Sequence, residues 1–187
     1  LGALTSTTLN ALSTTQVTAL TSKEVAGLTA AELNALSSTN AQALTTAALT
    51  GLSTTALSGA TTTALGYLTG TQLGALTTNQ VEALTTSQLT TATTTTLNAL
   101  NAARLSSTQI GGLTTTAANA LTTTQMAALT SKQTSGLNST EFSGLTSTNL
   151  QALTTSALDG VTSTVIGQLT STALNGLTTT QVAALSS

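Results

Sequence analysis

The sequence predicts an all-α fold, a solenoid of short capped helices with one helix in each eight-residue repeat. Three observations lead to this fold: a period of eight runs through the chain, Leu recurs at the start of the repeat, and Ser or Thr is often followed three residues later by Gln or Glu. The third pattern is the capping-box signature S/T-x-x-E/Q, which satisfies free N–H groups at the start of a helix.

The repeats, here called octads, run from Leu4–Ala11 (LTSTTLNA) to Leu177–Ala184 (LTTTQVAA). Position one is Leu in all but three octads, positions two to four are mostly Thr or Ser, and position five is often Gln, Glu or Asn. Position six is usually Leu, Val or Ile, and position eight is Ala or Gly with few exceptions.

The few charged residues indicate which positions face solvent. Positions four, five and seven hold seven of them: Lys23, Lys132, Glu24, Glu32, Glu141, Glu82 and Asp159. None stands at position one, six or eight, and burying an unpaired charge is costly. We therefore expect positions one, six and eight to form the interior and the other positions to be solvated.

The period excludes a long regular element. A continuous α-helix turns about 100° per residue, so the leucines of successive octads would drift by about 80° and form no seam. A single half-buried strand also fits poorly, because positions one and six would point to opposite faces. A helix that restarts in every octad fits both the leucines and the capping boxes at Ser13–Gln16, Thr21–Glu24, Thr69–Gln72, Thr77–Gln80, Thr122–Gln125 and Thr178–Gln181.

Helices this short must stack on one another, because isolated helices below roughly 12 residues are marginal in water. Small residues at position eight suit close approach of neighbouring backbones or a relaxed corner at the helix end. The glycines concerned are Gly27, Gly51, Gly59, Gly136, Gly144, Gly160 and Gly176. A β-solenoid with octads as half-coils stays open as the alternative, because Thr and Val favour strands.

One irregular unit interrupts the octads, the five residues 100–104 (LNAAR). The missing residues remove a cap, so Leu97–Leu105 could run as one longer helix. Around this unit a second-order repeat, in which the residue number increases by 109, relates Lys23 to Lys132, Glu32 to Glu141 and Asn40 to Asn149. We interpret residues 1–187 as a single repeat array.

The composition excludes several functions. A net charge of −2 offers no basic surface to nucleic acid or anionic lipid, and no apolar run is long enough for a membrane helix. The chain has no His or Cys, and its five acidic residues are scattered. We therefore expect no enzyme, no catalytic, cofactor-binding or metal residues and no cofactor.

Four uncommon residues are assigned to structure. Met126 and Phe142 stand at position six and are expected to fill the core. Tyr67 replaces a small residue at position eight, where we expect edge packing, and Arg104 is expected to be solvated at the irregular unit.

Two resemblances follow from the octads. LSTTQVTAL and LTTTQVAAL resemble the helix-opening L-T-x-x-Q-V-x-A-I of TAL effector repeats, but the longer period and the base-reading residues of that family are absent, so only a capped helix is implied. The whole chain is similar to the Thr/Ser-rich ALTTxQ-type arrays of large bacterial surface and secreted proteins, which are often described as adhesin-like.

We expect a structural protein that self-associates, as a subunit or stalk of an extracellular bacterial filament, sheath or adhesin. Low charge removes the repulsion that keeps proteins apart, which favours association. The alternative is a module at the cell surface that binds ice, glycan or another ordered lattice through rows of exposed Thr. Since the chain opens on Leu1 without Met, we expect it to be a segment of a longer protein.

Overall fold

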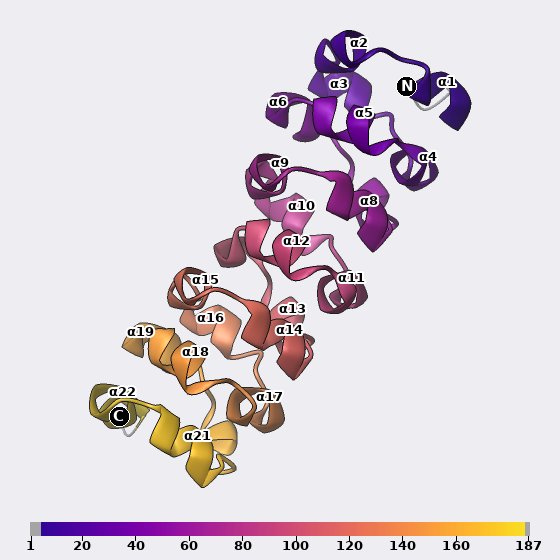
Figure 1. Ribbon diagram of the computed structural model, residues 1–187. Coiled ribbons are helices and arrows are strands. Elements are labelled where there is room, and N and C mark those ends of the chain that lie inside the picture. Colours follow the sequence, from indigo (N-terminus) through magenta and orange to yellow (C-terminus); the bar gives the residue numbers. More distant parts are fainter. Residues whose placement is uncertain (1–4, 186–187) are drawn as a thin grey trace. The chain divides into compact units, whose positions relative to one another are not determined.

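The computed structural model describes residues 5–185, and within them each octad contains one short helix (Figure 1). The predicted all-α array is confirmed. No strand occurs among these residues, so the β-solenoid alternative is wrong.

The chain divides into two compact units, Leu1–Leu100 and Asn101–Ser187. The helices of the first unit are α1 (Ser6–Asn10), α2 (Thr14–Thr18), α3 (Ser22–Val25), α4 (Ala30–Ala35), α5 (Ser38–Ala43), α6 (Thr46–Leu49), α7 (Thr54–Ser58), α8 (Thr62–Tyr67), α9 (Gly70–Ala75), α10 (Thr78–Glu82), α11 (Thr86–Thr91) and α12 (Thr94–Ala99). The second unit contains the 3₁₀ helix η1 (Ala102–Arg104), α13 (Ser107–Gly111), α14 (Thr115–Ala120), α15 (Thr123–Ala127), α16 (Ser131–Thr134), α17 (Ser139–Ser143), α18 (Ser147–Ala152), α19 (Thr155–Leu158), α20 (Ser163–Ile166), α21 (Ser171–Gly176) and α22 (Thr179–Leu185).

The octad starts and stops each helix by local chemistry. The Ser or Thr at position two has an extended backbone and caps the helix, as Thr61 does by accepting the N–H of Ala64 at 3.2 Å. Position one of the next octad then leaves the helical conformation, as at Leu44 and Leu68. No described residue has a positive φ, so these helices end without the left-handed glycine cap that is common elsewhere.

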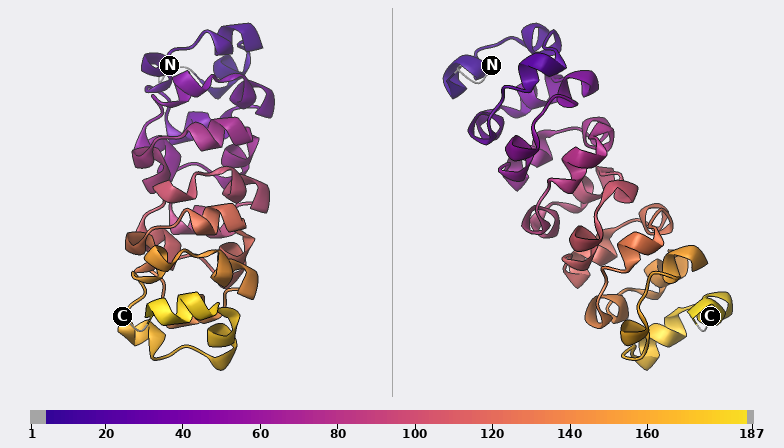
Figure 2. Two further views of the ribbon diagram at one scale, coloured as in Figure 1. Left: turned by 90° about the vertical axis from the view of Figure 1, so that its left-hand side faces the viewer. Right: turned by 180° about the vertical axis from the view of Figure 1, so that it is seen from behind.

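Within each unit, a helix packs on the helix three further along the chain. In the first unit α1 contacts α4, α2 contacts α5 and α3 contacts α6, and in the second α16 contacts α19 and α19 contacts α22. The pairs α4 with α8 and α17 with α21 also touch, so one coil of the solenoid holds between three and four octads. The view from the side and the view from behind both show the helices of successive coils lying against one another inside each unit (Figure 2).

Positions one and six form the core as predicted, for example Leu76 and Leu57. The prediction for position eight is wrong, because it is at least partly exposed in every described octad except that of Gly176. Position five takes its place and is buried in all but Thr8, Gln16, Glu24 and Glu141. The reason is helical spacing: positions five and six lie four and three residues before the next Leu and share its face, whereas position eight lies two residues after position six.

The irregular unit does not lengthen a helix, so the expectation for Leu97–Leu105 is wrong. Helix α12 ends at Ala99, Leu100 is extended, and Asn101 starts η1 by accepting the N–H of Ala103 at 3.1 Å. A short Asn side chain thus supplies the cap that the missing Thr would have given. The boundary between the two units falls directly after Leu100.

Candidate functional site

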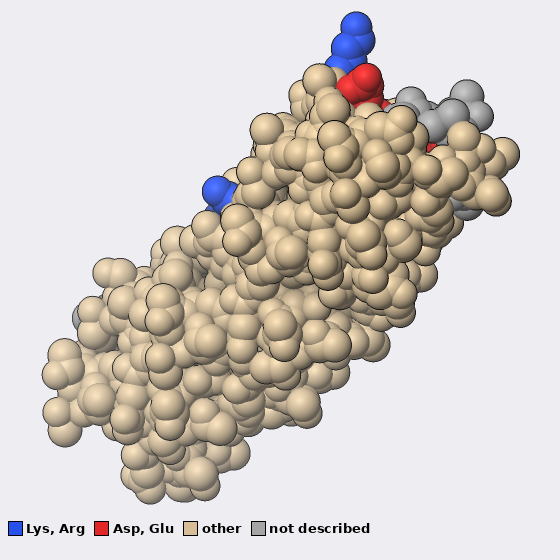
Figure 3. Space-filling view, turned by 45° about the horizontal axis from the view of Figure 1, so that its top comes forward, with Lys and Arg blue, Asp and Glu red and all other residues tan. Residues whose placement is uncertain are grey.

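The described residues contain no cluster of three or more His, Cys, Asp or Glu that could hold a metal ion. Charged side chains are few on the surface that Figure 3 shows, and most of that face is neutral. Lys23, Lys132, Glu82 and Asp159 are exposed, as predicted. The chemically distinctive groups are the buried amides at position five.

The oxygen of each position-five glutamine completes the capping box of its own helix. In α10, the Thr77 N–H donates to Gln80 Oε1 at 2.9 Å, and the Gln80 N–H donates to Thr77 Oγ1 at 3.3 Å. The bond from the N-cap N–H is present in all six predicted boxes. Two of the free N–H groups at the helix start are satisfied in this way.

The nitrogen of the same amide bonds an earlier coil. Gln80 Nε2 donates to the carbonyl oxygens of Leu49 at 2.7 Å and Leu52 at 2.8 Å, which lie 31 and 28 residues before it. Four further glutamines repeat this pair of offsets, and we call the set the amide ladder: Gln72, Gln80, Gln88, Gln133 and Gln181. Each ladder amide therefore joins the N-terminus of one helix to the C-terminus of the fourth helix before it.

The ladder explains how a polar position can be interior. Gln80 is 3% exposed, yet its amide oxygen and nitrogen are both hydrogen-bonded, so burial leaves no unpaired group. A carboxylate could accept the capping bond but could not donate to carbonyls. The frequent Gln at position five is the feature of the sequence that indicates this buried amide. The capping-box pattern accepts Gln and Glu equally and therefore does not reveal that a donor is needed.

A second polar contact links neighbouring coils through Asn at position seven, which the sequence did not single out. Asn34 donates from Nδ2 to the Gly59 carbonyl at 3.0 Å and accepts the Thr61 N–H at 2.7 Å. Asn119 makes the same pair of bonds to Gly144 and Thr146. These side chains bond the chain where one helix ends and the next begins.

Glycine at position eight allows close approach of the coils, as predicted. A Cβ added to Gly51 would lie 1.9 Å from the Ser22 carbonyl oxygen, and one added to Gly160 would lie 1.8 Å from that of Ser131. In both cases the partner stands at position three of the octad three before. The end of one helix thus rests on the first turn of the helix three before it.

The uncommon residues occupy structural positions. Phe142 and Met126 are fully buried, which confirms their predicted role in the core, and Tyr67 is half-buried. Arg104 is half-buried at the end of η1, so it is less solvated than predicted.

Glu24 is the exposed member of the position-five acids. The Thr21 N–H donates to Glu24 Oε2 at 2.8 Å and the Thr21 hydroxyl donates at 2.9 Å, which lowers the pKa of Glu24. Because these bonds favour the charged form, they stabilise the fold above the ordinary glutamate pKa, and this contribution is lost as the pH falls through the lowered value.

We expect a carboxyl-detected NMR titration to place the Glu24 midpoint below that of an ordinary glutamate. In Thr21→Ala the midpoint should rise only part of the way, because the backbone N–H, the larger cause, remains. An ordinary midpoint in the unmodified protein would contradict the capping geometry.

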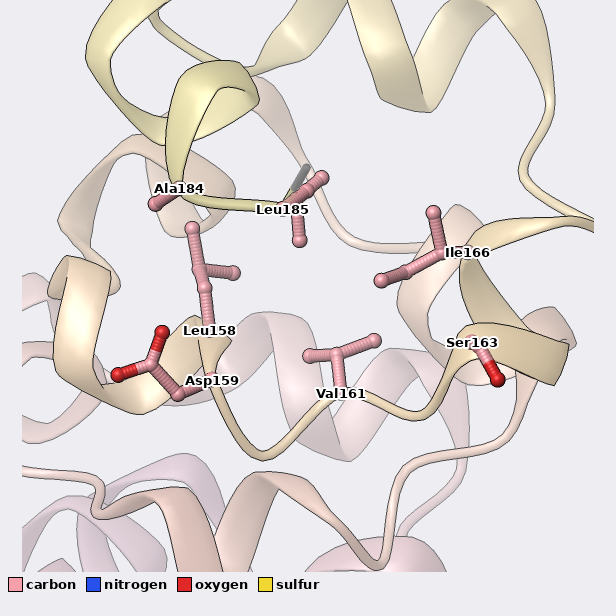
Figure 4. A pocket seen from close by; sticks show the side chains of 7 residues that line it. All are labelled: Leu158, Asp159, Val161, Ser163, Ile166, Ala184 and Leu185. Atoms are coloured by element: carbon pink, nitrogen blue, oxygen red, sulfur yellow. The ribbon is translucent and has the colours of Figure 1, made fainter. Parts of the chain in front are cut away.

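A few side chains are exposed at positions that are buried in most octads. Position six is almost fully buried in most octads, but Leu174 and Val182 near the C-terminus are 39% and 43% exposed. A hollow of about 500 Å³ opens near the same end, lined by Leu158, Asp159, Val161, Ser163, Ile166, Ala184 and Leu185 (Figure 4). At the other end, Gln16 and Glu24 are exposed at position five.

None of the described helices has the length and apolar character required to cross a bilayer. A family model described as the ALTTAQ repeat matches residues 1–30. Comparison with curated proteins and with solved structures gave no match. Over residues 1–30, the family match confirms the resemblance to ALTTAQ-type repeats that the octads predicted.

Proposed function

We propose that this chain is a structural protein, a repetitive solenoid that self-associates as a subunit or stalk of an extracellular bacterial filament, sheath or adhesin. The observation that carries the proposal is the amide ladder, because through it one octad binds another octad of the same kind. Where position five is a ladder glutamine, its amide bonds carbonyls of an earlier coil, next to the leucines of that coil. Each added coil can therefore pack on the coil before it through the same kinds of contact.

The surface supports the same role. Eight charged residues among 187 give little electrostatic repulsion between copies, and only three Lys and Arg are available to proteases that cleave after basic residues. The ALTTAQ-type repeats and their resemblance to bacterial surface arrays support an extracellular or cell-surface location. No catalytic role is proposed, since the sequence has no His or Cys and its five acidic residues are scattered along it.

The proposal predicts self-association that increases with concentration. Sedimentation velocity over a hundredfold range of protein concentration should show oligomers that electron microscopy resolves as fibres or bundles. A chain that remains a monomer at the highest concentration, together with unchanged surface structures in cells that lack the gene, would contradict the proposal.

A lattice- or glycan-binding role has less support. Exposed threonines are present at positions three and four, for example Thr123 and Thr124. Stacked coils bring position eight against position three, as Gly51 against Ser22. An ice recrystallisation assay and a glycan array would test this alternative, and clear inhibition or binding would favour it.

A further inference from the structure

We propose that a hollow between α17 and the segment joining α20 to α21 binds a neutral sugar unit, through the side chains of Ser139, Ser143 and Gln168. The hollow is lined by hydroxyl and amide groups. This site goes beyond the proposed self-association and does not depend on it, and it does not use the rows of exposed Thr.

The hollow lies between two coils of the second unit. It has a volume of about 370 Å³ and is lined by Ser139, Thr140, Ser143, Gly144, Gln168 and Thr170. The first four residues belong to the octad of α17, and the other two lie between α20 and α21. Both of these helices contact α17 (Figure 1). The walls of the hollow are therefore formed by octads that pack on one another within the array.

The second-order repeat provides a counterpart of this place in the first unit, where the two segments are in direct contact. Subtracting 109 from the residue numbers relates Ser139 to Ala30, Ser143 to Asn34 and Gln168 to Gly59. Gly59 lies against Ala30, since a Cβ added to Gly59 would be 2.6 Å from the Ala30 Cβ. Asn34 also joins the two segments, by donating to the Gly59 carbonyl at 3.0 Å and accepting the Thr61 N–H at 2.7 Å.

Replacements at the same positions open this contact in the second unit. Gln168 carries a side chain where the first unit has glycine, so the backbone there cannot come as close to α17 as its counterpart comes to α4. Ser143 is shorter than the Asn of the first unit, and its hydroxyl accepts the Thr170 N–H only at 3.4 Å. The space that results is the hollow.

The groups that line the hollow retain hydrogen-bonding capacity. The Ser139 hydroxyl donates to Gln168 Oε1 at 2.9 Å, which holds the amide across the hollow. Gln168 is exposed and its Nε2 has no partner among residues 5–185, so both N–H groups of the amide remain as donors. Thr140 is also exposed, and its hydroxyl can donate or accept.

A neutral sugar matches this lining. Sugar hydroxyls both donate and accept hydrogen bonds, as the Ser and Thr hydroxyls do, and they can also accept from the amide. None of the lining residues is charged, so a charged ligand would lose hydration without gaining a counterion. The volume is near the lower end of the range of about 300–1,000 Å³ that is usual for small-molecule sites. The proposed ligand is therefore one hexose unit of an uncharged glycan.

The test is an NMR titration of the full chain with methyl glucoside, methyl galactoside and methyl mannoside, followed through the backbone amide signals. At least one of these sugars should shift the signals of residues 139–144 and 168–170 in a saturable way. The counterpart residues 30–35 and 59–61 are the control in the same spectrum and should not shift. Sodium glucuronate is the charged comparison and should bind more weakly, and added salt should leave the affinity for the neutral sugars unchanged.

Two variants and a matched control test the residues. Gln168→Ala removes the free donors, and we expect the affinity to fall about tenfold, as for two lost hydrogen bonds. Gln42→Ala removes an exposed glutamine amide from α5 in the first unit and should change the affinity by less than about twofold. The combined replacement Ser139→Ala, Ser143→Asn and Gln168→Gly restores the residues of the first unit and should abolish saturable binding. Its circular dichroism should be unchanged, because the first unit already packs with those residues.

Saturable shifts confined to the hollow, weakened in Gln168→Ala and lost in the combined variant, would support the site. The proposal is wrong if none of the three sugars gives saturable shifts, if residues 30–35 and 59–61 shift equally, if Gln168→Ala keeps the full affinity, or if glucuronate binds more tightly. Shifts of the same residues on concentrating the protein without sugar would show that the hollow binds a second copy. That result would overturn the sugar assignment and leave the proposed self-association standing.

Discussion

Replacing Gln80 with Ala should lower the free energy of unfolding by about 2–4 kcal/mol. The substitution removes the Gln80 bonds to the Leu52 carbonyl and the Thr77 N–H and one of the two bonds to the Leu49 carbonyl, which keeps the Leu52 N–H. Each buried group left unsatisfied costs about 1–3 kcal/mol. Some of this cost is recovered if water enters the space left by the side chain.

The matched control is Gln16→Ala. Gln16 has the same capping box and the same neighbouring sequence, but it is exposed and makes no bond to an earlier coil in the described chain. Its loss should cost about 0.5–1 kcal/mol, the value of a helix cap. Urea unfolding followed by circular dichroism at 222 nm measures both, at a protein concentration low enough to exclude association. Equal losses would show that the ladder contributes no more than the cap.

Gly51→Ala should destabilise the fold by about 3 kcal/mol. The new methyl carbon would lie 1.9 Å from the Ser22 carbonyl oxygen, which is backbone and cannot turn aside as a flexible side chain would. The two coils would have to separate locally, and such overpacking costs about 1–3 kcal/mol or occasionally more.

Gly66→Ala is the control within the same unit and should have the opposite sign. Gly66 lies inside α8, and its added Cβ would meet only the Thr96 hydroxyl oxygen at 3.8 Å. Alanine favours the helix and restricts the unfolded chain, so a gain of about 0.5–1 kcal/mol is expected. Thermal and urea unfolding of the two variants give the comparison, and a loss of stability in both would disprove the assignment of close approach to position eight.

The part of the candidate site that is local in sequence, the capping boxes, could be predicted from the sequence. The capping boxes were visible because the two side chains that form each one stand three residues apart, and Gln80 and Thr77 interact whatever surrounds them. The partners of Gln80 Nε2 were not visible, since Leu49 and Leu52 lie 31 and 28 residues away. That separation depends on the number of octads in one coil, and the eight-residue period does not determine this number.

The interior shows the same division at positions five and eight. Gln88 stands four residues before position one of the next octad, so helical spacing places it on the buried face. A polar side chain is expected in solvent unless its hydrogen-bond partners are known, and the partners of Gln88 are distant in sequence. Gly51 was correctly expected to allow close approach, yet only the packing of α6 on α3 showed that the Ser22 backbone is what it approaches.

The sequence by itself determined the helices of this protein: their number per octad, their caps, their ends and the leucines they share, because all of these depend on residues within one repeat. The tertiary structure alone decided how the octads form coils, and therefore which carbonyls receive each amide and which glycines meet a backbone. The physical reason is that short helices acquire their stability from neighbours about 30 residues away, through contacts whose spacing depends on packing.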